Sequence, residues 1–436
     1  MAKTKNNQTA RFIIQGGAPL SGTIAASGNK NSALKLLPAC ILTEEPVTLH
    51  NVPDIADIHT MIAILRSLGV QLEDLGGGSW KVQAKTIETH VVDPTLASVI
   101  RASIVLVGPM LARMGKIDIA PPGGDVIGRR RIDTHMLALG ALGATYETNE
   151  VFKFEAKSLT GADILLDEAS VTATENALMA AALAKGTTII RNAASEPHVQ
   201  DLCNFINTLG GQVEGIGSNV LTVHGVDKLH GGEFKVGADF MEVGSFIGAA
   251  AVTHGRVRIT DASPEHLSMI ALVYNRLGVH WEVEGSDVIV PEYQPLKILP
   301  DIGDKIPEIK AQPWPAFPSD LMSIALVMAT QAEGTVLFHE WMYDTRFFFV
   351  DKLLYMGARI VLCDPHRCLV QGPNRLKGDK ERISSPDIRA GMSLLLAALC
   401  AEGTTIIRNV GQIDRGYEDV QGKLKALGAK IERVSE

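Results

Sequence analysis

A glycine-rich loop places one carboxylate close to three arginines. In PPGGDVIGRRRIDTH, residues 121–135, Asp125 follows two prolines and two glycines, and the run Arg129, Arg130 and Arg131 comes shortly after it. Arginine binds carboxylate and phosphate groups through a planar fork of donors. Each charge-assisted hydrogen bond contributes about 1.5–3 kcal/mol, so a few well-placed cations can hold a small polyanion. An arginine run alone is more often a solvated surface, so this interpretation needs support from elsewhere in the chain.

That support comes from cations at the starts of predicted buried helices. Apolar runs such as ALMAAALA, SFIGAAAV and SLLLAALC predict helices without a polar face, which must be buried on most sides. A helix N-terminus is the positive end of a dipole, so a cation there is unfavourable unless an anion neutralises it. Lys30, Arg101 and Arg389 lie at such starts, which indicates an anionic ligand. Four polar residues at the same starts are equally suited to be plain N-caps, namely Asn29, Ser170, Ser319 and Asp387.

The helices belong to a repeated unit. A tag that ends a helix recurs as SLGVQLE, ALGATYE, TLGGQVE, RLGVHWE, YMGARIV and ALGAKIE, with successive glycines 74, 67, 68, 79 and 71 residues apart. A glycine suits the left-handed position after a helix. The pattern predicts an α/β protein with six copies of helix, strand, helix, strand, three in each of two domains, and one buried helix in each copy. The tag glycines are Gly69, Gly143, Gly210, Gly278, Gly357 and Gly428.

Composition narrows the class of protein. A chain of 436 residues is too long for one ordinary core. A net charge of -8 and a pI near 5.9 argue against general binding to nucleic acid or to a membrane surface. No run approaches the roughly 18 apolar residues of a membrane span, and residues 1–11 are polar with no apolar signal region behind them. The five cysteines form no CxxC pair, so we expect free thiols, mostly buried, in a cytoplasmic protein.

Five segments resemble the enolpyruvyl transferase family: SGNKNSAL, RASIVLVGPMLAR, PGGDVIGRRRID, PAFPSD and IDRGYEDVQGKLKALGA. The resemblance covers nearly the whole chain after about residue 11, with the motifs in order. It implies a pair of inside-out α/β barrels with three repeats each. Domain 1 would span residues 31–238 and carry the 121–135 loop as a lid. Domain 2 would join residues 1–30 to 239–436, with the active site in the cleft between the domains.

The resemblance also implies a reaction. The enolpyruvyl group of phosphoenolpyruvate would pass to the sugar 3-hydroxyl of UDP-N-acetylglucosamine, through a tetrahedral ketal, with release of phosphate and without a metal or organic cofactor. Lys30, Arg130 and Arg415 would bind phosphoenolpyruvate, and Asp320 would be the base for the attacking hydroxyl. The other implied residues are Asn31 at the sugar, Arg101 at the nucleotide sugar, Arg131, Ile132, Asp133, Thr134, Ser170, Val171 and Met342 at the uridine diphosphate, and Arg346, Asp387 and Arg389 as further members of the site.

Asp125 departs from the usual family pattern. Most members have a cysteine at this position, assigned as the acid that protonates the enolpyruvyl methylene. An aspartate starts near pKa 3.9 and a cysteine near 8.5, so donation near neutral pH requires a rise of roughly three units, about 4 kcal/mol. Closure over substrate anions would raise the pKa, and the neighbouring arginines would lower it. The alternative role for an aspartate after Gly-Gly is that of an ordinary turn residue.

Further departures leave the acceptor open. Glu168 stands where some relatives have lysine, Arg131 where proline is usual, and Thr172 where glycine is usual. Two alternatives therefore remain. One is an enolpyruvyl transferase with another acceptor, such as shikimate 3-phosphate, and the other is a non-catalytic paralogue that binds nucleotide sugars. The glycine-rich and lysine motifs of the shikimate branch are not found. The paralogue is disfavoured because the expected reactive residues are all retained, namely Lys30, Asp125, Arg130, Asp320 and Arg415.

Overall fold

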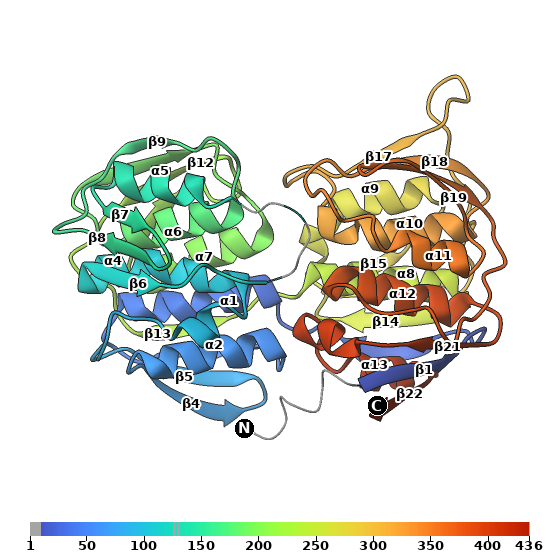
Figure 1. Cartoon of the computed structure of the whole chain (residues 1–436), viewed down its shortest axis with the longest axis horizontal. Coiled ribbons are helices and arrows are strands. Elements are labelled where there is room, and N and C mark those ends of the chain that lie inside the picture. Colours follow the sequence, from blue (N-terminus) through green and yellow to red (C-terminus); the bar gives the residue numbers. More distant parts are fainter. Residues whose placement is uncertain (1–9, 125–127, 129–130, 436) are drawn as a thin grey trace. The chain divides into compact units, whose positions relative to one another are not determined.

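The apolar runs of the sequence form the buried helices of two units. A computed structural model describes residues 10–124, 128 and 131–435 (Figure 1). We call residues 10–27 with 238–435 the terminal unit, and residues 28–124 with 131–237 the central unit. Each unit has its own hydrophobic core.

The terminal unit is an α/β structure with three sheets. Their strand orders are β21-β1-β22, which is antiparallel, and the mixed sheets β15-β16-β14-β2 and β17-β18-β20-β19. Its elements are β1 (Ala10–Gln15), β2 (Ser21–Ala25), α8 (Phe240–Val252), β14 (Arg256–Thr260), η3 (Pro264–His266), α9 (Ser268–Arg276), β15 (Glu282–Glu284), β16 (Asp287–Val290), β17 (Glu308–Lys310), η4 (Ser319–Leu321), α10 (Met322–Gln331), β18 (Gly334–His339), α11 (Val350–Tyr355), β19 (Arg359–Asp364), β20 (Arg367–Gly372), α12 (Ile388–Cys400), β21 (Thr404–Ile407), η5 (Val410–Arg415), α13 (Val420–Ala426) and β22 (Lys430–Ser435).

The central unit has the same kind of architecture. Its sheets have the orders β13-β3-β5-β4 and β11-β12-β10-β9, both mixed, and β6-β8-β7, which is antiparallel. Its elements are α1 (Lys30–Ala39), η1 (Cys40–Leu42), β3 (Val47–His50), α2 (Ala56–Ser67), β4 (Gln71–Gly76), β5 (Ser79–Gln83), α3 (Pro94–Ala97), η2 (Arg101–Leu106), α4 (Val107–Met114), β6 (Lys116–Ile119), α5 (Asp133–Ala141), β7 (Thr145–Thr148), β8 (Phe152–Glu155), β9 (Asp163–Leu165), α6 (Val171–Ala181), β10 (Thr187–Arg191), α7 (Pro197–Thr208), β11 (Gln212–Glu214), β12 (Val220–His224) and β13 (Gly232–Lys235).

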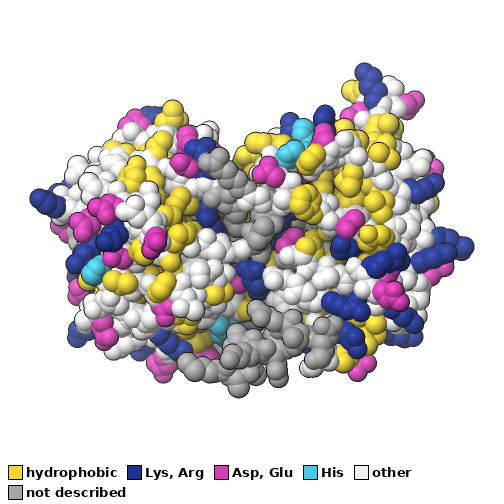
Figure 2. Space-filling model, viewed as in Figure 1, with side chains coloured by type: hydrophobic (Ala, Val, Ile, Leu, Met, Phe, Trp, Pro, Cys, Tyr) yellow, Lys and Arg dark blue, Asp and Glu magenta, His cyan; other side chains and the backbone are white. Residues whose placement is uncertain are grey.

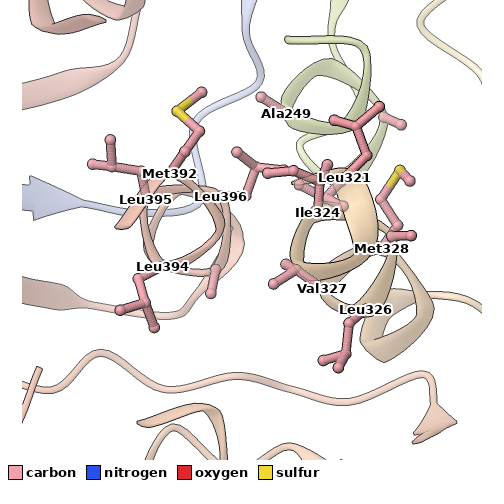
Figure 3. Close-up of a cluster of buried hydrophobic side chains, with 14 of the residues drawn as sticks. Ala249, Leu321, Ile324, Leu326, Val327, Met328, Met392, Leu394, Leu395 and Leu396 are labelled. Atoms are coloured by element: carbon pink, nitrogen blue, oxygen red, sulfur yellow. The ribbon is translucent and has the colours of Figure 1, made fainter. Parts of the chain in front are cut away.

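Three apolar helices form the centre of the terminal unit. Helices α8, α10 and α12 pack against one another, and leucine, isoleucine and methionine side chains fill the space between them (Figure 3). Small residues on α8 allow this close approach, because a Cβ on Gly248 would lie 2.8 Å from Ile324 Cγ2 and 3.2 Å from Leu396 Cδ2. The prediction that helices without a polar face are buried is confirmed for these three.

The six tag glycines end helices as predicted. Each follows the C-cap of α2, α5, α7, α9, α11 or α13, and each has a positive φ, between 75° for Gly278 and 100° for Gly143. The longest interval, between Gly278 and Gly357, contains a turn in which Asp301 N donates to Lys305 O at 2.9 Å and the Ile302 side chain is 97% exposed.

The described residues contain neither a membrane-spanning helix nor a metal-binding cluster. No helix there is long and apolar enough to cross a membrane. The same residues contain no cluster of histidine, cysteine and acidic side chains that could hold a metal ion. All five cysteines are free thiols; Cys40, Cys203 and Cys368 are buried, Cys400 is half-buried, and Cys363 is exposed.

We predict that Gly248→Ala destabilises the terminal unit. The added methyl group has no space between α8, α10 and α12, so the free energy of unfolding should fall by about 1–3 kcal/mol. Gly140→Ala on α5 is the matched control, because the nearest atom to its Cβ would be Tyr146 Cε1 at 4.0 Å. The control should leave stability unchanged or raise it by about 0.5–1 kcal/mol. Equal urea midpoints for the two variants would contradict the packing argument.

Candidate functional site

The residues selected from the sequence fall into two groups, one on each unit. Asp320, Met342, Arg346, Asp387, Arg389 and Arg415 lie on the terminal unit, and Lys30, Asn31, Arg101, Arg131, Ile132, Asp133, Thr134, Ser170 and Val171 lie on the central unit. Asp125 and Arg130 lie outside the described residues.

In the terminal unit, Asp320 lies between two guanidinium groups. Its Oδ1 accepts a hydrogen bond from Nη2 of Arg346, and its Oδ2 accepts one from Nε of Arg389 at 2.9 Å. Asp320 is only partly buried, whereas both arginine side chains are almost fully buried. The carboxylate is therefore held at both oxygens while part of it stays accessible, which suits a group that must meet a substrate hydroxyl.

Asp387 and Arg389 form the start of α12. Asp387 caps the helix, accepting from the backbone N–H groups of Arg389 at 2.8 Å and Ala390 at 3.0 Å. The Arg389 guanidinium lies 5.2 Å from the ring centre of Tyr417. Burial by itself would lower the pKa of Arg389, but Tyr417 and Asp320 raise it above the ordinary value, so the group stays charged. Its buried Nη1 has no hydrogen-bond partner among the described residues, which leaves a donor for an anion.

Arg346 is the second cation on Asp320. Burial acts to lower its pKa, but the carboxylates of Asp320 and Asp387 raise the pKa above the ordinary value. The distance from Arg346 Nη1 to Asp387 Oδ1 is 3.9 Å.

The other two predicted residues of the terminal unit, Met342 and Arg415, have separate partners. Met342 N donates to Glu340 Oε1 at 2.9 Å, and Arg415 Nη1 donates to Gln412 Oε1 at 2.9 Å.

The capping interpretation is confirmed at three positions and wrong at one. Asn29 accepts from Ser32 N, Ser170 accepts from Ala173 N, and Asp387 caps α12 as above. Ser319 does not cap a helix, because Pro318 is the N-cap of η4. The Ser319 hydroxyl instead donates to Glu340 Oε2 at 2.5 Å, a contact that local sequence does not indicate.

In the central unit, Lys30 is paired with an acid that sequence analysis missed. Lys30 is the first residue of α1, and its Nζ lies 2.8 Å from Asp57 Oδ2, with both side chains buried. Asp57 therefore supplies one negative charge for the cation at this helix start. Its only signal in the sequence was an acid among the apolar residues of the amphipathic helix α2.

A second buried pair lies further along α1. Lys35 Nζ is 3.5 Å from Glu175 Oε1 on α6, and both side chains are fully enclosed. Burial raises the pKa of Glu175 to about 8, and burial lowers the pKa of Lys35. The pair adds a carboxyl group with a strongly raised pKa to the same unit as Lys30.

Residues 131–134 are held by the protein's own carboxylates. Arg131 binds Asp133 with Nε at 3.0 Å and Asp167 with Nη2 at 3.2 Å. The Thr134 hydroxyl donates to Asp167 at 2.6 Å, and Arg101 Nη2 donates to Arg131 O at 3.1 Å. Ile132 is the half-buried N-cap of α5. These contacts fix the backbone between the loop and α5, and they hold the Arg131 side chain on two acids.

A buried histidine orients the start of α6. Asn176 Nδ2 lies 2.9 Å from His135 Nδ1, and an amide nitrogen can only donate, so the histidine hydrogen is on Nε2. Nε2 then donates to the Thr172 hydroxyl at 3.0 Å, which leaves the hydroxyl's own hydrogen to donate elsewhere. Burial lowers the pKa of His135 to about 3, so this pattern persists at neutral pH. The Thr172 hydroxyl therefore presents a hydrogen-bond donor at this helix N-terminus.

Comparison with known proteins identifies the family. The family model for EPSP synthase (3-phosphoshikimate 1-carboxyvinyltransferase) matches residues 14–424. UDP-N-acetylglucosamine 1-carboxyvinyltransferase from Treponema denticola is 54% identical over 421 residues, which is 97% of this chain and 98% of the relative. The chain belongs to the enolpyruvyl transferase family. The resemblance seen in its motifs is thereby confirmed, and the protein is a carboxyvinyltransferase.

Other enolpyruvyl transferases support this membership. The enzyme of the same name from Bradyrhizobium diazoefficiens is 55% identical and covers 98% of both chains. A solved enolpyruvyl transferase from Streptomyces tendae has 26% identity and a TM-score of 0.86, covering 98% of this chain and 99% of that one. EPSP synthase from Acinetobacter baumannii, at 18% identity and a TM-score of 0.76, covers 98% of this chain and 100% of that one and shares the fold.

We predict that His135 makes the enolpyruvyl transferase less stable in mild acid. The unfolded chain binds a proton on this histidine below about pH 6.5, whereas the folded chain does not until about pH 3. Stability should therefore fall as the pH drops from 6.5, by about 2 kcal/mol at pH 5 from this group alone. In His135→Gln that part of the loss should vanish. Urea unfolding at pH 7.5 and pH 5 tests this, and an equal loss in both proteins would contradict it.

Proposed function

We propose that this enolpyruvyl transferase transfers the enolpyruvyl group of phosphoenolpyruvate to the 3-hydroxyl of UDP-N-acetylglucosamine and releases phosphate, the first committed step of peptidoglycan synthesis. The observation that carries the proposal is identity of 53–55% over nearly the full chain with relatives named for this activity. The solved relatives at lower identity share the fold and do not decide the acceptor.

The donor is held by cations. Lys30, Arg130 and Arg415 bind the phosphate and carboxylate of phosphoenolpyruvate. Asp57 keeps the Lys30 ammonium in place at the start of α1, with Nζ and Oδ2 2.8 Å apart. The buried Nη1 of Arg389 adds a donor for substrate anions on the terminal unit. Because both units contribute cations, we propose that the two groups act in one reaction, with Lys30 and Arg415 as members of it.

Asp320 is the general base in this proposal. As the hydroxyl of the acceptor attacks the central carbon of phosphoenolpyruvate, Asp320 accepts its proton, and Asp125 delivers a proton to the methylene carbon. The resulting tetrahedral ketal then loses phosphate and a methyl proton to restore the double bond. Two arginines fix the Asp320 carboxylate before substrate arrives, so little reorganisation is needed for proton transfer.

The nucleotide sugar meets the central unit. Ser170 and Val171 at the start of α6 offer donors to the diphosphate, and Arg101, residues 131–134 and Met342 contribute to binding of the nucleotide. Asn31 meets the sugar. Thr172 replaces the usual glycine, yet its hydroxyl is turned by His135 into a donor, so this departure is compatible with an anionic ligand. Glu168 accepts the N–H of Ser170 through its backbone oxygen at 2.7 Å.

The proposal includes the domain architecture and the cellular location of the protein. We infer that the six helix–strand copies form two inside-out barrels, with domain 1 at residues 31–238 and domain 2 at residues 1–30 with 239–436, in a cytoplasmic protein that does not bind nucleic acid. Six sheets in the described residues and the six tag glycines support the repeat. On the face drawn in Figure 2, basic and acidic side chains are interspersed, as suits small-molecule substrates.

The acceptor is tested by phosphate release from phosphoenolpyruvate with either UDP-N-acetylglucosamine or shikimate 3-phosphate. Release with the nucleotide sugar alone is the expected result. Release with the shikimate ester alone would assign the other acceptor. No release with either compound, combined with tight binding of the nucleotide sugar, would show a non-catalytic binding protein.

We predict that Asp125→Ala abolishes turnover and spares binding. The variant lacks the acid that protonates the methylene carbon, so kcat should fall at least about a hundredfold, while calorimetric affinity for UDP-N-acetylglucosamine stays within a few-fold. Asp133→Ala is a useful comparison. It also removes a carboxylate near the arginine run 129–131, but Asp133 follows the run, whereas Asp125 precedes it, and it binds Arg131. A near-normal rate in Asp125→Ala would remove the acid role.

A further inference from the structure

Glu340 joins the two segments that carry Asp320 and Arg346. It follows β18 and its side chain is fully buried. Its Oε1 accepts from Met342 N at 2.9 Å, which shapes the segment leading to Arg346, and its Oε2 accepts from the Ser319 hydroxyl at 2.5 Å, next to Asp320. One carboxylate therefore fixes the chain on both sides of the Asp320–Arg346 pair.

The direction of each hydrogen bond in this chain is determined. Arg346 Nε lies 3.3 Å from Ser319 Oγ, and an arginine nitrogen can only donate. The single hydrogen of the Ser319 hydroxyl must then go to Glu340, which acts as the acceptor. Arg346 therefore donates to both Asp320 and Ser319, and Ser319 donates to Glu340.

We propose that Glu340 is a positioning residue for the transfer reaction: through Ser319 it holds Arg346 against Asp320, and its charge allows Asp320 to take up a proton. The proposal rests on the proposed function, in which Asp320 is the base. Glu340 does not touch the substrate in this scheme, and it acts only through its neighbours.

The charge balance among two arginines and three acids, called the cluster below, explains why the Glu340 charge helps Asp320 to take up a proton. Arg346 and Arg389 are positive, and their contacts join them to three acids, Asp320, Asp387 and Glu340. With Glu340 ionised, these three carboxylates carry one negative charge more than the two guanidinium groups, and uptake of a proton by Asp320 removes that excess. Without the Glu340 charge the same step would leave an excess positive charge. Uncompensated charge in a buried site is costly, so proton uptake would become less favourable.

If Glu340 only shaped the backbone of the segment that leads to Arg346, it would not need to be charged. Burial raises the pKa of Glu340, and the Ser319 hydrogen bond and the Arg346 charge act in the opposite direction. A neutral acceptor could satisfy Met342 N at a smaller desolvation cost. The presence of a carboxylate beside Arg346 is therefore consistent with a use for its charge.

Other titratable groups face the cluster, and none of them is replaced in the variants of the test. The Tyr343 ring centre lies 5.2 Å from the Arg346 guanidinium, and Tyr417 has the same relation to Arg389. Asp239 on α8 also acts on Arg389, although its carboxylate caps that helix. His366 Nδ1 lies 2.7 Å from the Glu340 backbone oxygen, and its Nε2 lies 3.8 Å from Asp344.

The test is the pH dependence of phosphate release by the full-length chain, with phosphoenolpyruvate and UDP-N-acetylglucosamine, from pH 5 to 9. In Glu340→Gln, kcat should fall roughly ten- to a hundredfold because Arg346 and Asp320 lose their alignment. KM for both substrates should stay within about twofold. The acid limb of kcat should move to lower pH by about half a unit to one unit, because loss of a negative charge favours the ionised form of Asp320.

Ser319 variants separate position from charge. Ser319→Ala should lower kcat by a similar factor but leave the acid limb in place, because the Glu340 charge remains. Ser319→Thr keeps the hydroxyl and should restore most of the rate. Glu242→Gln is the matched control, since Glu242 is a buried acid of the same unit that binds Lys423 Nζ at 2.7 Å and Ser27 N at 2.7 Å. It should lower thermal stability and leave kcat and the acid limb unchanged.

The outcomes separate the two proposals. A wild-type chain that releases no phosphate with these substrates contradicts the proposed function itself. An active wild type with a Glu340→Gln variant of normal kcat, or with an unmoved acid limb, overturns the role of Glu340. If Glu340→Gln does not fold, the serine variants decide, because a normal kcat in Ser319→Ala also overturns the proposal.

Discussion

A buried charge is costly unless it is paired, and the candidate site on the terminal unit depends on this constraint. Arg346 and Arg389 are almost fully buried, and each donates a hydrogen bond to Asp320. Removing one member of such a pair leaves an uncompensated buried charge, which typically costs about 3–5 kcal/mol. The same requirement fixes the carboxylate in one orientation before any substrate binds. Stability and preorganisation thus have a common origin in this cluster.

The central unit meets the constraint with a different chemistry. Lys30 and Lys35 lie on one helix and are paired with Asp57 and Glu175 respectively. A lysine is a compact point charge, whereas an arginine binds through a fork with defined directions. The two arginines therefore fix the direction of the Asp320 carboxylate, whereas each lysine faces its acid as a point charge.

Local signals in the sequence predicted local structure well. A glycine after a helix needs a positive φ, and the left-handed position after Leu68 or Leu427 depends only on adjacent residues. Capping by Asn29 and Asp387 is likewise decided within three residues. The packing of α8, α10 and α12 also followed from composition, because helices without a polar face have few other places in a folded chain.

Contacts between distant segments could not be predicted in the same way. Ser319 has the residue type of an N-cap, yet its hydroxyl bonds to Glu340, 21 residues away, and Pro318 occupies the N-cap position of η4 without a side-chain hydrogen bond. Cations at helix starts were interpreted as evidence of an external anion. The structure shows that Asp57 and Asp320 already provide part of the neutralisation. Nothing in one sequence states which acid meets which base, because that depends on how the units fold.

The central claim is that the carboxylate held between Arg346 and Arg389 is the base of the transfer reaction. The most direct test is a single-turnover measurement with Asp320→Asn, in which product formation is followed by rapid quench and affinity for UDP-N-acetylglucosamine by calorimetry. If Asp320 is the base, binding should persist within a few-fold while the chemical step slows by about 10²–10⁴-fold. A chemical step within tenfold of the wild type, at unchanged affinity, would contradict the account.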